Sequence, residues 1–81
     1  MTTDEQVEFL RSYDYDVAPR DVFMRTTGLP AGLQERASKY PGLWVVFDPL
    51  DDAEGFLLVG HDRAALVKEA YEHLDSLLDG E

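Results

Sequence analysis

Segment 48–55 holds four carboxylates close together, which raises the question of a cation site. A calcium loop of the EF-hand type needs oxygen ligands at alternate positions, a central glycine and a glutamate at its twelfth position. Here Pro49 and Leu50 stand where ligands would be required. We therefore interpret the segment as a solvated acidic turn, and we expect no metal ligands in the chain.

The histidines, His61 and His73, are the side chains best suited to acid-base or metal chemistry. They are twelve positions apart, which corresponds to about 18 Å of helix rise at ~1.5 Å per residue. They cannot share a metal within one chain. His61 lies beside Asp62, but no nucleophile is placed near them by the sequence. We expect structural or surface roles for both histidines and no catalytic residue.

Leu74-Asp75-Ser76-Leu77 is similar to the Asp-Ser-Leu attachment site of acyl carrier proteins. In those carriers the serine opens a central helix, and more chain follows that helix. Ser76 lies five residues before the end of the sequence, in a helix that is already under way. Because the context of a motif decides its meaning, we expect no attached cofactor.

Aromatic residues that alternate with carboxylates are the remaining candidates for binding. They occur in Tyr13-Asp14-Tyr15-Asp16, which we interpret as a connection between elements. Tyrosine suits a contact surface because its ring is apolar and its hydroxyl is polar. The carboxylates would suit a basic peptide, although a solvated loop is the simpler explanation. The candidate partner-contact residues are Tyr13, Asp14, Tyr15, Asp16, Asp51, Asp52 and Glu54.

The charge of the chain restricts its partners. Its 81 residues include 17 acidic and seven basic ones, which gives a formal net charge of −10. Affinity for phosphate comes from clustered lysine and arginine, so we expect no direct binding to nucleic acid or to an anionic membrane. A basic protein partner would fit this charge, and so would a simple requirement for solubility.

The composition is typical of one small folded domain, residues 1–81, in which residues 1–18 form a flexible or docking segment. Hydrophobic residues make up 44% of the chain, enough for a globular core. There is no cysteine, and no apolar run approaches the ~20 residues that span a bilayer. The first residues are acidic rather than basic and then apolar, unlike a signal peptide. We expect a cytoplasmic protein.

The pattern of apolar residues predicts an α+β fold. Two short runs rich in β-branched and aromatic residues, about 43–48 and 56–60, predict an antiparallel β-hairpin. A continuous apolar stripe over about 62–78 predicts a long C-terminal amphipathic helix with Asp62 as its N-cap.

Short helices are expected before the hairpin. Thr3 and Gln6 resemble a capping box for a helix over about 4–12. Pro19 suits the first turn of a helix over about 20–26, with Val22 and Phe23 facing inward. A third helix is expected over about 31–40. Its inward residues at helical spacing are Leu33, Ala37 and Tyr40.

The hairpin is apolar on both faces, so both faces need cover. Successive side chains of a strand point to opposite sides, which places Trp44 and Val46 on one face and Leu43, Val45 and Phe47 on the other. The C-terminal helix can cover one face only. Either the N-terminal helices cover the second face of a two-stranded sheet, or hairpins of two chains associate. A monomer and a homodimer therefore both remain open, and a strand added by another partner is a third route.

From Tyr40 onward the chain resembles a family of short prokaryotic proteins known as a domain of unknown function. The pattern is an aromatic residue, one residue, glycine, one residue and Trp-Val, then a hairpin and Gly-x-Asp at the start of a helix. It falls on Tyr40, Gly42, Trp44, Val45, Gly60 and Asp62. The resemblance implies a strand-strand-helix unit and supplies no activity.

These observations predict a small acidic protein without catalysis of its own that acts through protein-protein contact. A regulator or an antitoxin-like inhibitor of a basic partner is the expected form of that function. The alternative is a small-molecule binder or enzyme, with a pocket between the hairpin and the N-terminal helices or at a dimer seam. The polar groups of such a pocket would come from Tyr13, Asp14, Tyr15, Arg25 or His61.

Overall fold

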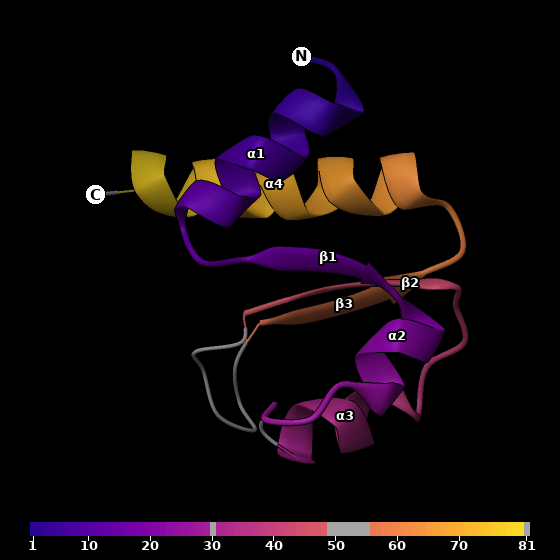
Figure 1. Cartoon of the computed structure of the whole chain (residues 1–81). Coiled ribbons are helices and arrows are strands. Elements are labelled where there is room, and N and C mark those ends of the chain that lie inside the picture. The colour runs from indigo at the N-terminus through magenta and orange to yellow at the C-terminus, as the bar shows by residue number, and fades with distance from the viewer. Residues whose placement is uncertain (30, 49–55, 81) are drawn as a thin grey trace.

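A computed structural model describes residues 1–29, 31–48 and 56–80 of the chain. The elements follow in the order α1 (Thr3–Ser12), β1 (Asp16–Pro19), α2 (Arg20–Arg25), α3 (Ala31–Ala37), β2 (Trp44–Phe47), β3 (Leu57–Gly60) and α4 (Arg63–Asp79), as Figure 1 shows. The fold is α+β, as the sequence predicts. The hairpin and the long C-terminal helix lie within one residue of the expected bounds.

The sheet has three antiparallel strands in the order β1-β2-β3, so the expectation of a two-stranded sheet is wrong. Val46, in the central strand, pairs with Val17 on one side and with Leu58 on the other. The missing strand, β1, begins within the segment that we interpreted as a connection. Val17 is its single large aliphatic residue, and Pro19 cannot donate to a ladder, so the usual strand signals are weak.

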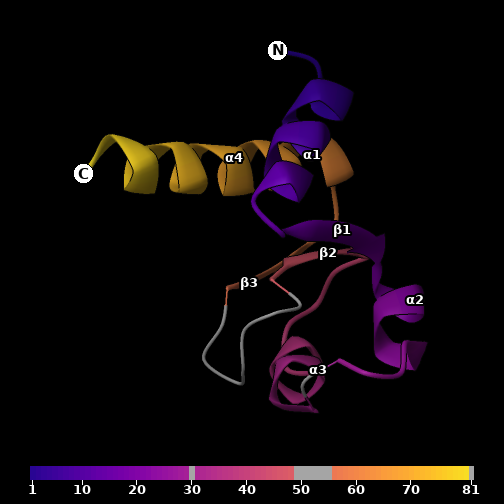
Figure 2. The same ribbon diagram turned by 60° about the vertical axis from the view of Figure 1, so that its left-hand side comes forward.

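Helices cover both faces of the sheet, which gives three layers (Figures 1 and 2). On one face α1 and α4 pack against Val17 and Val46. On the other face α2 and α3 pack against Val45 and Phe47, with Phe23 and Leu33 fully buried between them. The cover that the two apolar faces require is thus supplied by helices of the same chain.

The predicted division of β2 between the two faces is confirmed. Trp44 and Val46 contact the core under α4, whereas Val45 and Phe47 belong to the core under α2 and α3. Leu43 is an exception, because it lies before the strand and is 63% exposed. Trp44 is half-buried, and the Arg63 guanidinium lies 5.7 Å from its ring centroid.

Helix α4 begins at the expected cap, where the Asp62 carboxylate accepts the Ala64 N–H at 3.1 Å. Its buried residues are Leu66, Val67, Ala70 and Leu74. The apolar stripe predicted over about 62–78 includes Leu77 and Leu78, but its buried part is shorter than expected, since these two residues are 53% and 40% exposed. The C-terminal end of α4 extends past the sheet in Figure 1, so its last turn has no strand beneath it.

The N-terminal helices depart from the prediction in their details. The capping box of α1 uses Thr2 and Glu5, one residue earlier than expected. On α2, Phe23 is buried, but Val22 faces solvent and is 47% exposed. Helix α3 ends at Ala37, so Tyr40 lies outside it and is 56% exposed instead of facing inward. None of the helices that the structure describes is long and apolar enough to cross a bilayer.

Candidate functional site

Residues Tyr13 to Asp16 form the junction between α1 and β1, and we call them the Tyr13–Asp16 turn. Tyr13 is the C-cap of α1, and Asp14 follows in a left-handed conformation with φ of 68°. The Asp14 N–H donates to the Arg11 carbonyl, and the Tyr15 N–H donates to the Leu10 carbonyl, each at 3.0 Å. These two bonds define a Schellman motif, which reverses the chain and leads it into the sheet.

Asp14 occupies a position where glycine is the usual residue. The left-handed conformation brings the Cβ atom close to the backbone, and an aspartate there costs about 1–2 kcal/mol. Asp14 is exposed, so packing of its side chain does not offset this cost. Outside the glycines, Asp14 has the only positive φ in the described part of the chain.

Tyr13 is supported by aromatic residues of the two helices beneath it. Its ring centroid lies 5.2 Å from that of Phe9, and the Phe9 centroid lies 5.1 Å from that of Tyr71 on α4. Such tilted and edge-on pairs contribute about 0.5–1.5 kcal/mol beyond the area that they bury. The Tyr13 ring is therefore held in place while 45% of the residue remains exposed.

Tyr15 begins a second series of rings that crosses the end of the sheet. It stacks on Phe56 at 4.9 Å, and Phe56 stacks on His73 of α4 at 4.8 Å. The series joins the residues just before β1 and β3 to the exposed side of α4. The two tyrosines of the turn are consequently anchored on the same helix, by separate sets of contacts.

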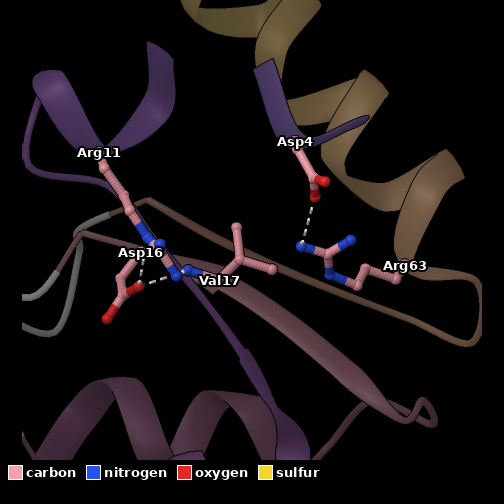
Figure 3. A network of polar contacts seen from close by, with 5 residues as sticks. All are labelled: Asp4, Arg11, Asp16, Val17 and Arg63. Atoms are coloured by element: carbon pink, nitrogen blue, oxygen red, sulfur yellow. Dashed lines mark hydrogen bonds and ion pairs between the residues drawn. The ribbon is translucent and has the colours of Figure 1, made fainter. Parts of the chain in front are cut away.

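Asp16 fixes the start of β1, as Figure 3 shows. Its Oδ1 atom accepts the Val17 N–H at 2.8 Å and lies 3.5 Å from Arg11 Nε. The side chains of Arg11 and Asp16 are 59% and 48% exposed, so this ion pair contributes well under ~1 kcal/mol. It nevertheless places the Arg11 charge beside Asp16.

The structure brings together four of the seven candidate partner-contact residues, Tyr13, Asp14, Tyr15 and Asp16. Asp51, Asp52 and Glu54, like the rest of the acidic segment 49–55, lie outside the described residues. The turn is at the end of the sheet where Asp16 pairs with Phe47 and Phe47 pairs with Leu57.

The groups proposed for a small-molecule pocket are not gathered. His61 follows Gly60, at the opposite end of β3 from the Tyr13–Asp16 turn. Arg25 ends α2, on the other face of the sheet, and its Nε donates to the Asp21 carbonyl at 3.2 Å. Three strand residues rise about 10 Å, so His61 and the turn do not converge.

The aromatic residues Phe9, Phe56 and His73 support the turn, but no pattern in the sequence assigns them to it. Their proximity depends on where α1 and α4 cross the sheet, and no local sequence pattern predicts the position of that crossing. The turn itself carried a detectable signal. Tyr13, Tyr15 and Val17 alternate with acidic residues, which is the period of a half-buried strand.

Comparison with known proteins finds no matching family model, no matching curated protein and no matching solved structure. The resemblance from Tyr40 onward to a prokaryotic domain of unknown function therefore stays a prediction. The function has to be argued from the geometry of the chain itself.

Proposed function

We propose that this protein acts by binding a basic protein partner through the Tyr13–Asp16 turn, as a regulator or an antitoxin-like inhibitor. It does so without catalysis of its own. The cysteine-free sequence is compatible with a reducing compartment, and we place this function in the cytoplasm as part of the same proposal.

The conformation of Asp14 is the observation that carries the proposal. A left-handed residue with an exposed carboxylate is less stable than the glycine that this motif favours. Strain of this kind is retained where a side chain serves a purpose other than stability. A carboxylate displayed between two tyrosines, Tyr13 and Tyr15, is a suitable ligand for an arginine or lysine side chain of a partner.

The rigidity of the turn supports the same function. Tyr13 and Tyr15 are each held by ring contacts, and the backbone between them is fixed by the Schellman hydrogen bonds. A surface that is already ordered loses less conformational entropy when it binds. Tyrosine anchors with fixed rings are typical of protein-binding surfaces.

The charge of the chain would favour a basic partner during encounter. With a formal net charge of −10, the protein attracts cationic surfaces over distances comparable to the Debye length, about 8 Å at physiological ionic strength. Arg11, the basic residue that precedes the turn, lies beside Asp16. Asp14 is not part of that ion pair.

Affinity capture from the native host with three matched baits tests the proposal. The baits are the wild type, Asp14→Asn and Glu35→Gln. The Asn variant keeps a residue that tolerates the left-handed conformation but removes the charge. The Gln variant makes the same change of charge at an exposed position of α3, behind the other face of the sheet.

We expect a stoichiometric basic protein on the wild-type and Glu35→Gln baits. Asp14→Asn should lower its affinity about tenfold, measured by titration calorimetry with the purified partner, because one charge-assisted hydrogen bond is weakened. Equal affinity of all three proteins would place the interface elsewhere. Recovery of no stoichiometric basic protein would contradict the proposed function.

A further inference from the structure

The two edges of the sheet differ in their capacity to accept another strand. Arg20 N–H donates to the Leu43 carbonyl, which extends the β1–β2 ladder and directs the backbone groups of Val17 and Pro19 outward. The outward Val17 N–H is already bonded to Asp16 Oδ1, and Pro19 has no N–H. The β1 edge is therefore blocked by two of the devices that natural edge strands use, a proline and a local charge.

The β3 edge lacks these devices. Asp48 N–H donates to the Phe56 carbonyl at 3.2 Å, so Asp48 and Phe56 are a hydrogen-bonded pair. Such pairs alternate along an antiparallel ladder, which directs the N–H and C=O groups of Leu57 and Val59 away from β2. In the residues that the structure describes, no further strand pairs with this edge.

The sequence of β3 would favour an added strand. Its residues Leu57, Leu58, Val59 and Gly60 include no charge and no proline, and all of them are half-buried. An uncharged edge of this kind is a template for backbone pairing. Leu58 packs against one apolar core and Val59 against the other. Apolar side chains of an added strand would extend these cores.

On the side of this edge that α4 covers, the charges favour one kind of strand. His73 stacks on Phe56, so this side of α4 lies toward β3. Glu69 is one turn earlier on the same side and Asp62 is two turns before Glu69, and both are exposed. A second copy of the chain would bring its own carboxylates close to those of the first copy, so that like charges repel. It would also add another charge of −10. A strand with lysine or arginine side chains would meet opposite charge.

We propose that the β3 edge binds an extended, basic segment of a partner protein as a fourth strand of the sheet. The proposal rests on the proposed function in one respect, that the partner is basic. It assigns a second point of contact to that partner, at a place distinct from the Tyr13–Asp16 turn. Backbone hydrogen bonds would supply affinity, and the flanking carboxylates would supply the preference for a basic strand.

Two synthetic peptides of about ten residues test this assignment. This length is sufficient to form a strand, because strands of about five to six residues are typical. One alternates valine with lysine, and the other alternates valine with glutamate. Each is titrated into the isotopically labelled full chain, and binding is followed by NMR at every amide. We expect the lysine peptide to shift and protect the Leu57 and Val59 amides, and the glutamate peptide to leave them unchanged.

A matched pair of variants isolates the backbone bond. Val59→Pro removes the outward N–H, whereas Val59→Thr keeps it and removes a similar amount of apolar surface. We expect Val59→Pro to bind the lysine peptide about tenfold more weakly than Val59→Thr. Amide mapping on the wild type decides the question independently if Val59→Pro does not fold.

Each other outcome overturns the assignment in a distinguishable way. Shifts at the Tyr13–Asp16 turn without shifts at β3 would remove the edge site and leave the proposed function intact. Equal binding of both peptides at β3 would overturn the preference for a basic strand. A wild-type dimer in light scattering that is lost in Val59→Pro would show that a second copy occupies the edge. Failure of the lysine peptide to bind anywhere would contradict the edge site, while the capture experiment would still decide the function.

Discussion

Replacing Asp14 by glycine should make the protein more stable and bind its partner less well. The substitution relieves about 1–2 kcal/mol of left-handed strain. It also increases the freedom of the unfolded chain, which costs about 0.5–1 kcal/mol. The Asp14 side chain is exposed, so its removal takes away little packing. From the middle of each range, the expected net gain is about 0.75 kcal/mol, or about 3–6 °C in Tm for a domain of this size.

Urea and thermal unfolding of four proteins would measure this effect. The expected order of stability is Asp14→Gly highest, wild type and Asp14→Asn equal within about 0.5 kcal/mol, and Asp14→Ala lowest. Alanine has neither the freedom of glycine nor the local tolerance of asparagine, so it controls for simple loss of the carboxylate. If the glycine variant were no more stable than the alanine variant, Asp14 would not be strained. The argument from strain to function would then fail.

Two further predictions concern the ends of the fold. Hydrogen bonds from the Thr2 backbone N–H and then the Thr2 hydroxyl lower the pKa of Glu5, so its ionised form stabilises the folded state. That stabilisation is complete above the ordinary glutamate pKa and is lost as the pH falls through the lowered pKa of the folded state. In urea unfolding from pH 7 downward, the free energy of unfolding should therefore decline less for Glu5→Gln than for the wild type. At the sheet, a Cβ atom on Gly42 would lie 2.8 Å from the backbone N and O of Gly60. Gly42→Ala should therefore destabilise the chain by about 1–3 kcal/mol in thermal unfolding, and a cost within ~0.5 kcal/mol would show that β3 moves freely.

The sequence predicts the parts of this fold whose signals are local. The run Trp44–Phe47 is made of β-branched and aromatic residues, and the apolar stripe on α4 has the helical period. Both elements lie within one residue of the expected position. Strand β1 has only a weak signal, because the alternation that leads into it stops at Val17, and Ala18 and Pro19 follow. Strand β1 forms because the edge of β2 that faces away from β3 is free to pair with it. That pairing depends on the tertiary structure and not on a local sequence pattern.

The candidate site was predicted as a set of residues but not as a structure. Residue types and alternation drew attention to Tyr13 and Tyr15, whereas the strain at Asp14 depends on how α1 ends. A glycine in the left-handed position would have allowed the Schellman motif to be predicted from the sequence. Aspartate stands there instead, so the usual glycine signal is absent at this position. The support from Phe56 and His73 depends on the crossing of α4 over the sheet, which no short pattern encodes.

The cover over both faces also changes where association can occur. The hairpin was expected to require either its own helices or a second chain, because each face is apolar. Phe23 and Leu33 now fill one side and Val67 and Leu74 the other, so stacking of two sheets would have to displace packed helices. Of the sheet itself, the perimeter is what remains for a partner. On that perimeter the β1 edge is blocked by Asp16 and Pro19, the β3 edge carries outward backbone groups, and the Tyr13–Asp16 turn lies at one end. A partner that enters at the β3 edge would therefore extend the sheet without disturbing either core.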